Sequence, residues 1–161
     1  MGIRREPLDK LLLRHGADKS KLADAQTHAE RAGISLLGGI TRTNAVEDQA
    51  LAKALAEITG LESLEKVDIE EIDIELIRQV PLGLARDQGV LPLWKRDGVV
   101  EVALASPSSI GSLDDFRVLF GHAVRAFIMA PGQLRDLTNA AYDAASRTAS
   151  AVIDEIEEEE G

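Results

Sequence analysis

The chain has 161 residues, of which 45% are hydrophobic and 29% are charged, so it can fill the core of one domain or of two small ones. It contains no cysteine, which excludes disulfides, thiolate nucleophiles and cysteine-bound metals. A formal net charge of −10 argues against a general nucleic-acid binder, because phosphate contacts need clustered lysine and arginine.

The negative charge is concentrated at the C-terminal end. Residues 154–160 carry six acids, which leaves a charge of −4 for the remainder of the chain. We therefore expect residues 146–161 to form a flexible acidic tail or a linker. No apolar run approaches the roughly 20 residues of a membrane helix, and the N-terminus has no hydrophobic signal core, so we expect a cytoplasmic protein.

Residues 1–60 contain two similar helical units. In each unit a short helix ends at a residue that tolerates left-handed backbone angles, Gly16 in the first and Asn44 in the second, and a longer helix follows. Leu12 corresponds to Ile40 at the same offset of 28 residues that relates Gly16 to Asn44. This degenerate repeat predicts an N-terminal subdomain of four packed helices.

An acidic connection over residues 61–75 follows the helical units, with seven acids, one lysine and alternating apolar residues. Residues 76–145 then predict a small α/β subdomain. Its first part has two short helices that are separated at Pro81, because proline disfavours helix in the residue before it.

The remaining pattern of this subdomain is ββαβα. Asp97-Gly98 predicts a two-residue hairpin turn between two strands. Ser112 and Asp115 resemble a capping box at the start of a helix, residues 123–130 predict a third strand, and Pro131 begins the last helix. The fold class is therefore α+β, with a four-helix subdomain before a three-stranded sheet that helices cover.

Patterns that carry chemistry are absent from the sequence. It has no GxxxxGK[ST] phosphate loop and no GxSxG nucleophile turn, so we expect no enzymatic activity in this chain, although a larger parent protein could be an ATPase. His15, His28 and His122 are far apart and lack the spacing of metal ligands, so we expect no metal site.

The order of short motifs over about residues 8 to 145 resembles the N-terminal domain of the assembly ATPases of type II secretion and type IV pilus systems. The matching residues are Pro81, Ala85, Leu91-Pro92-Leu93, Val102-Ala103, Ser106-Pro107, Leu113-Asp114, Gly121 and Tyr142. The resemblance implies a protein-interaction and regulatory domain without catalysis of its own. It also implies a partner, the cytoplasmic domain of an inner-membrane platform protein, and a place at the membrane through that partner.

In a subset of the family, the resemblance further implies that the tandem helical units bind cyclic di-GMP. The candidate residues here are Arg14, Gly16, Leu37, Gly38 and Arg42. The chain departs from the motif of that subset, because Leu36 stands at an arginine position and Pro7 and Asp9 replace arginine and glycine in the first unit. Guanine and phosphate recognition needs such donors, so the structural interpretation of the units is favoured and no cofactor is expected.

Trp94, Lys95 and Arg96 lie together on the predicted hairpin and are the candidate anchors for a protein partner, since tryptophan and arginine are enriched at binding hot spots. A half-buried core role for Trp94 is the alternative. Two other functions stay open, a stand-alone adaptor or cyclic di-GMP sensor with this fold, and a helix-turn-helix DNA binder. The DNA binder is disfavoured by the small basic excess of the first 31 residues, seven bases against five acids.

Overall fold

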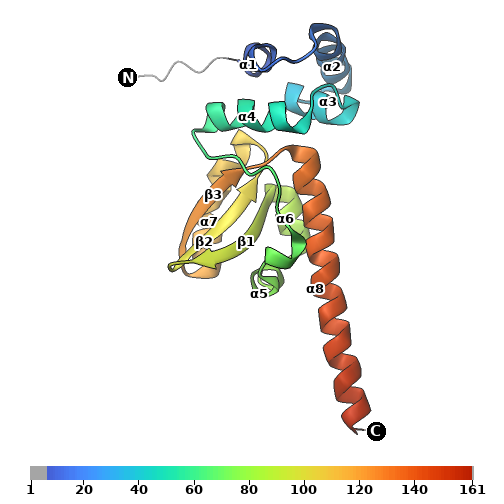
Figure 1. Ribbon diagram of the computed structural model, residues 1–161, viewed down its shortest axis with the longest axis vertical. Coiled ribbons are helices and arrows are strands. Elements are labelled where there is room, and N and C mark those ends of the chain that lie inside the picture. The colour runs from blue at the N-terminus through green and yellow to red at the C-terminus, as the bar shows by residue number, and fades with distance from the viewer. Residues whose placement is uncertain (1–6, 161) are drawn as a thin grey trace.

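The computed structural model describes residues 7–160, with side chains described up to residue 147. A helical subdomain lies across one end of a small sheet, and the last helix runs along the sheet and projects beyond it (Figure 1). The helical subdomain contains α1 (Leu8–Arg14), α2 (Lys19–Ala32), α3 (Leu36–Thr43) and α4 (Asp48–Thr59). The elements that follow are the 3-10 helix η1 (Ile69–Glu71), α5 (Ile74–Arg78), α6 (Leu82–Gln88), β1 (Val90–Arg96), β2 (Val99–Leu104), the 3-10 helix η2 (Pro107–Ser112), α7 (Leu113–Phe120), β3 (Ala123–Ile128) and α8 (Pro131–Glu160).

The two helical units are confirmed and pack across each other. The short helix of each unit is followed by a left-handed residue, Gly16 with φ 90° and Asn44 with φ 54°. α1 packs against α4 and α2 packs against α3, so each short helix contacts the long helix of the other unit. The equivalent residues Leu12 and Ile40 are both buried in the shared core.

The close approach of α3 to α2 depends on Gly39 in α3. A Cβ atom at this position would lie 2.5 Å from the Ala25 carbonyl oxygen and 2.8 Å from the Ala29 Cβ. Both neighbours belong to α2 and are buried. The absence of a side chain at Gly39 therefore sets how closely α2 and α3 can pack.

The sheet has the order β1-β2-β3, with β1 antiparallel to β2 and β2 parallel to β3. The predicted hairpin turn is confirmed, since Asp97 and Gly98 have φ values of 52° and 77°. β1 contains a bulge between Pro92 and Trp94, so that Leu93 has no partner opposite it on β2. The bulge lets both Leu93 and Trp94 pack on the same side of the sheet.

The acidic connection closes parts of both edges of this sheet. Beside β3, the Ile128 N–H donates to the Glu62 carbonyl at 2.8 Å and the Leu64 N–H donates to the Ile128 carbonyl at 2.9 Å. Beside β1, the Asp73 N–H donates to the Leu93 carbonyl at 2.7 Å. The segment predicted as an extended connection thus supplies hydrogen bonds that a three-stranded sheet lacks at its edges.

Two apolar clusters lie on the two faces of the sheet. On one face, β2 residues such as Val102 pack with α7 and with the helical subdomain. On the other face, Leu91 and Leu93 pack with α5 and α8. Tyr142 of α8 joins the two clusters, and its hydroxyl donates to the Val80 carbonyl between α5 and α6 at 2.6 Å.

The α+β fold and the ββαβα order are confirmed, but one local prediction is wrong. Ser112 is not the side-chain cap of α7: its backbone is already helical and its hydroxyl donates to Gln88 Oε1. The segment predicted as a tail or linker, residues 146–161, lies mostly within α8, which continues as a helix to Glu160. Residues 146–160 contain neither glycine nor proline and are rich in glutamate, which favours helix. A linker role for this segment stays a prediction.

Replacing Gly39 by alanine should destabilise the chain, because the new methyl group would collide with α2. We expect Gly39→Ala to lower the free energy of unfolding by about 1–3 kcal/mol. The matched control is Gly83→Ala in α6, where a Cβ meets nothing within 4 Å, and this variant should be neutral or slightly more stable. Urea unfolding, monitored by circular dichroism, measures the free energy of unfolding of both variants. Equal stability of the two variants would contradict the close approach of α2 and α3.

Tyr142 should make the stability of the chain depend on pH in the alkaline range. Burial raises the pKa of the Tyr142 phenol from 10.0 to about 12. The folded state therefore favours the neutral phenol, and this contribution is complete below pH 10 and is lost as the pH rises toward about 12. We expect the stability difference between the wild type and Tyr142→Phe to shrink across that window, as measured by urea unfolding at about pH 8 and about pH 11. A difference that stays constant would contradict the burial of the phenol.

Candidate functional site

The candidate site lies at the hairpin end of the sheet and is organised by a carboxylate in the central strand. Glu101 of β2 is buried, with a side chain that is 9% exposed. Its Oε1 accepts a hydrogen bond of 2.8 Å from the indole Nε1 of Trp94. Trp94 and Glu101 face each other in the β1-β2 register, so the bond joins two neighbouring strands.

Two arginines lie beside this pair. The Arg96 guanidinium lies 4.8 Å from the centre of the Trp94 ring, and its Nε lies 3.7 Å from Glu101 Oε1. On β3, Arg125 is the register partner of Glu101 and lies over the Phe127 ring at 5.5 Å. The side chains of Arg96 and Arg125 are 65% and 60% exposed. The site therefore consists of an aromatic ring and a buried carboxylate, with two guanidinium groups exposed to solvent beside them.

The three predicted anchors do not all belong to this site. Trp94 and Arg96 are two residues apart on β1 and lie in contact, as described above. Lys95 lies between them and therefore faces the other side of the strand, where its Nζ is 3.0 Å from His122 Nε2. The predicted group is thus divided by the alternation of the strand, and Lys95 belongs to a separate contact with the residue before β3.

Glu101 and Arg125 were missed by the sequence analysis. Glu101 is the only charged residue of β2, whose other residues are apolar. A lone acid in a buried strand needs a hydrogen-bond partner, and that signal was available in the sequence. Arg125 gave no such signal, because its position beside Glu101 depends on the parallel pairing of β2 with β3.

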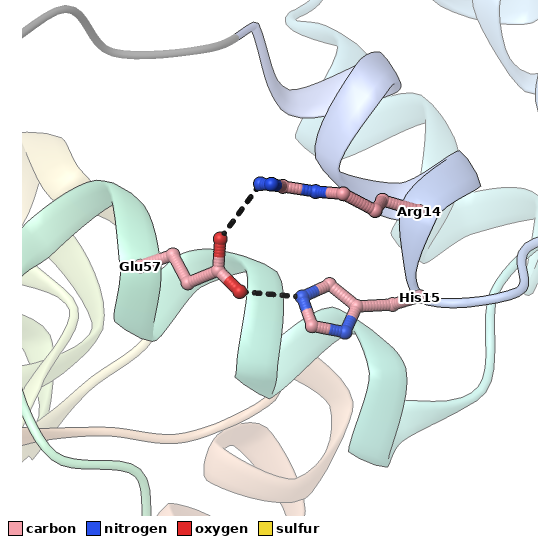
Figure 2. Close-up of polar contacts among 3 residues, drawn as sticks. All are labelled: Arg14, His15 and Glu57. Atoms are coloured by element: carbon pink, nitrogen blue, oxygen red, sulfur yellow. Dashed lines mark hydrogen bonds and ion pairs between the residues drawn. The ribbon is translucent and has the colours of Figure 1, made fainter.

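The candidate cyclic di-GMP residues lie on α1, in the turn that follows it, and on α3. Figure 2 shows that Arg14 and His15 both point toward Glu57 of α4, with Arg14 Nη2 at 3.1 Å from Oε2 and His15 Nε2 at 2.8 Å from Oε1. Glu57 is thereby shared between Arg14, the last residue of α1, and His15, which follows it, and it joins this end of α1 to α4. A phosphate that approached Arg14 would have to compete with this carboxylate.

The other four candidates for cyclic di-GMP are placed as follows. Gly16 is exposed and left-handed in the turn after α1. Leu37 and Gly38 lie partly buried in the first turn of α3, where the Gly38 N–H donates to the Ser35 hydroxyl at 3.1 Å. Arg42 is exposed in the last turn of α3. The two arginines therefore come from helices that pack against different partners, α4 for Arg14 and α2 for Arg42.

Within the described part of the chain, no three histidine, aspartate or glutamate side chains are placed to hold a metal ion. In the same residues, no helix has the length and apolar character needed to cross a bilayer.

The Glu101 carboxylate should stabilise the hairpin by accepting from Trp94. We expect Glu101→Ala, which leaves the half-buried indole N–H without its acceptor, to lower the free energy of unfolding by about 1–3 kcal/mol. Glu101→Gln keeps a side-chain oxygen at this position and should cost less. Trp94 is the only tryptophan, so its fluorescence reports directly on urea unfolding of both variants. Equal losses in the two variants would contradict the role of the Trp94 hydrogen bond.

The fold is shared with proteins of known structure. The structure is similar to a solved structure described as MshE with cdg, at a TM-score of 0.60 and 19% identity, covering 86% of this chain and 100% of that one. It is also similar to the N-terminal domain of XpsE, at a TM-score of 0.54 and 16% identity, covering 85% of this chain and 97% of that one. These likenesses show a shared fold.

Curated relatives are named type IV pilus assembly ATPase PilB. The protein from Myxococcus xanthus is 24% identical over 136 residues, which are 84% of this chain and 24% of the relative. The proteins from Pseudomonas aeruginosa and Thermus thermophilus are 26% and 28% identical over 83% and 92% of this chain, and over 23% and 16% of their own lengths. This chain therefore spans a quarter or less of these relatives.

The family model of the MshEN domain matches residues 60–148, which are more than half of the chain and contain the whole sheet. This match agrees with the predicted resemblance to the N-terminal domains of pilus and secretion ATPases and confirms it. The chain belongs to the MshEN domain family.

Proposed function

We propose that this chain is a non-catalytic docking domain of a type IV pilus or type II secretion assembly ATPase, either as a part of that protein or as a separate adaptor. Its partner in this proposal is the cytoplasmic domain of an inner-membrane platform protein. The observation that carries the proposal is the match to the MshEN family over the sheet subdomain, together with the pilus ATPase relatives.

The docking surface in this proposal is the face formed by Trp94, Arg96, Glu101 and Arg125. Aromatic and arginine side chains dominate the binding energy of many interfaces. Here the indole is already fixed by its 2.8 Å hydrogen bond to Glu101, and Arg96 is held against the ring by cation–π attraction. Binding of a partner to this face would therefore cost little side-chain entropy in this chain.

The charges of the face indicate the chemistry of the partner. Both arginines are mostly exposed: Arg96 lies 3.7 Å from the buried carboxylate of Glu101, and Arg125 lies 3.6 Å from the exposed carboxylate of Glu62. The face therefore presents two guanidinium groups to solvent, although the whole chain carries −10. An acidic surface that also offers an aliphatic or aromatic side chain would complement it.

Cyclic di-GMP sensing is the second candidate, because a structure with the same fold is described with cdg. The residues of this chain favour it less than docking. Leu36 and Pro7 supply no hydrogen-bond donor where the motif has arginine, and Arg14 is engaged with Glu57 at 3.1 Å. The docking proposal therefore predicts that cyclic di-GMP leaves partner affinity unchanged.

Binding to the cytoplasmic domain of the platform protein from the same pilus or secretion system tests the proposal. We expect Arg96→Glu to raise the dissociation constant at least tenfold, which corresponds to a loss of about 1.4 kcal/mol of binding free energy. The matched control is Arg117→Glu on α7, an exposed arginine whose carboxylate partner is the nearby Asp114, and it should bind like the wild type. Isothermal titration calorimetry with and without cyclic di-GMP measures all three chains.

The outcomes separate the proposal from its alternative. No binding by the wild-type chain would contradict the docking function. Binding that Arg96→Glu leaves unchanged would contradict the proposed surface. A change of affinity on adding cyclic di-GMP would favour the second candidate.

A further inference from the structure

A second feature of the surface lies away from the hairpin, in a cavity of about 230 Å³ between α6, the end of β2 and the start of α8. Its floor is apolar and is formed by the buried residues Ala85, Ala105 and Leu134. Its rim carries Arg86 and Arg135, which are exposed. The cavity therefore combines an apolar interior with two cationic groups at its mouth.

The positive charge of the rim is only weakly compensated. Arg86 Nη2 donates to the neutral amide oxygen of Asn139 at 3.1 Å. Arg135 Nε lies 3.5 Å from the Asp136 carboxylate, but both side chains are mostly exposed, and such pairs contribute little. The residues that line the cavity include no acid. This is an unusual composition in a chain with a net charge of −10.

The size of the cavity selects among the possible occupants. Pockets for small molecules and cofactors commonly enclose about 300–1,000 Å³. A volume of about 230 Å³ instead suits one or two aliphatic side chains from a protein. With the two arginines at the mouth, the favoured occupant is an aliphatic side chain with carboxylates on both sides of it in the sequence.

The sequence of this chain contains such a segment at the end of α8. Residues 152–160 read VIDEIEEEE, so Ile156 has an acid on either side and six acids accompany it in all. A chain cannot place this segment in its own cavity. Thr138 lines the cavity, and Ile156 lies about 27 Å farther along the same continuous helix at about 1.5 Å per residue. Figure 1 shows that this end of α8 points away from the cavity-forming elements.

We propose that the acidic end of α8, residues 152–160, docks into the Arg86–Arg135 cavity of a second copy of this chain. The contact joins two different surfaces, so it is a head-to-tail contact that extends to further copies or closes into a ring. Carboxylates of the segment pair with the two arginines, and an aliphatic side chain fills the apolar floor. This inference does not depend on the platform partner proposed above.

Sedimentation velocity of the 161-residue chain at several concentrations tests the inference. We expect association at low ionic strength that weakens steeply by about 0.5 M salt, because the pairing of exposed charges is screened. The double variant Arg86→Glu/Arg135→Glu should remain monomeric, and so should Glu155→Lys/Glu157→Lys. An equimolar mixture of the two variants should associate again into pairs, because the unchanged acidic segment of the first variant can dock into the unchanged cavity of the second.

Two further variants control the experiment. Arg117→Glu changes an exposed arginine on another surface and should associate like the wild type. Ile156→Ser keeps every charge and should weaken association at least fivefold by removing the aliphatic group. Circular dichroism checks that each variant folds, which we expect because the rim arginines are exposed. A wild-type chain that stays monomeric at low salt would overturn the inference, as would association that both double variants retain.

Discussion

The sheet of this domain depends on one segment, residues 61–73, that closes part of both of its edges. Three strands alone leave a row of unpaired backbone groups on each side. The segment bonds to Ile128 at one edge and to Leu93 at the other, at 2.7 to 2.9 Å, and its last part leads directly into α5. Since it also connects the helical subdomain to the sheet, the same residues fix the position of one subdomain against the other.

The hairpin end of the sheet, which this segment does not close, is the proposed binding surface. The helices α5 and α8 cover the face at Leu91 and Leu93, and Trp94 lies where that cover ends, half buried. The hydrogen bond between Trp94 and Glu101 joins the two strands of the hairpin and orients the indole that the docking proposal uses. In that proposal, recognition depends on the same buried carboxylate as the predicted stability of the hairpin, whereas the cavity beside α6 is separate from it and carries its own pair of arginines.

The sequence predicted those features that local chemistry determines. Asp97-Gly98 identified the hairpin, Gly16 and Asn44 identified the helix ends, and the order of elements was right throughout the sheet subdomain. The errors concern single residues. The alternation of β1 places Lys95 on the opposite side from Trp94 and Arg96, and the 3-10 helix before α7 gives Ser112 helical backbone angles, so that its side chain does not cap α7. The cavity joins Arg86 and Arg135, which are far apart in the sequence, so no local pattern could have indicated it.

In the docking proposal, the hairpin face, rather than the helical units, contacts the platform partner. Hydrogen–deuterium exchange of the chain with and without the cytoplasmic platform domain tests this most directly, because it reports on every segment in one experiment. We expect slower exchange in residues 94–101 and around Arg125 of β3 when the partner is bound. Slower exchange confined to α1–α4, with the hairpin unchanged, would contradict it.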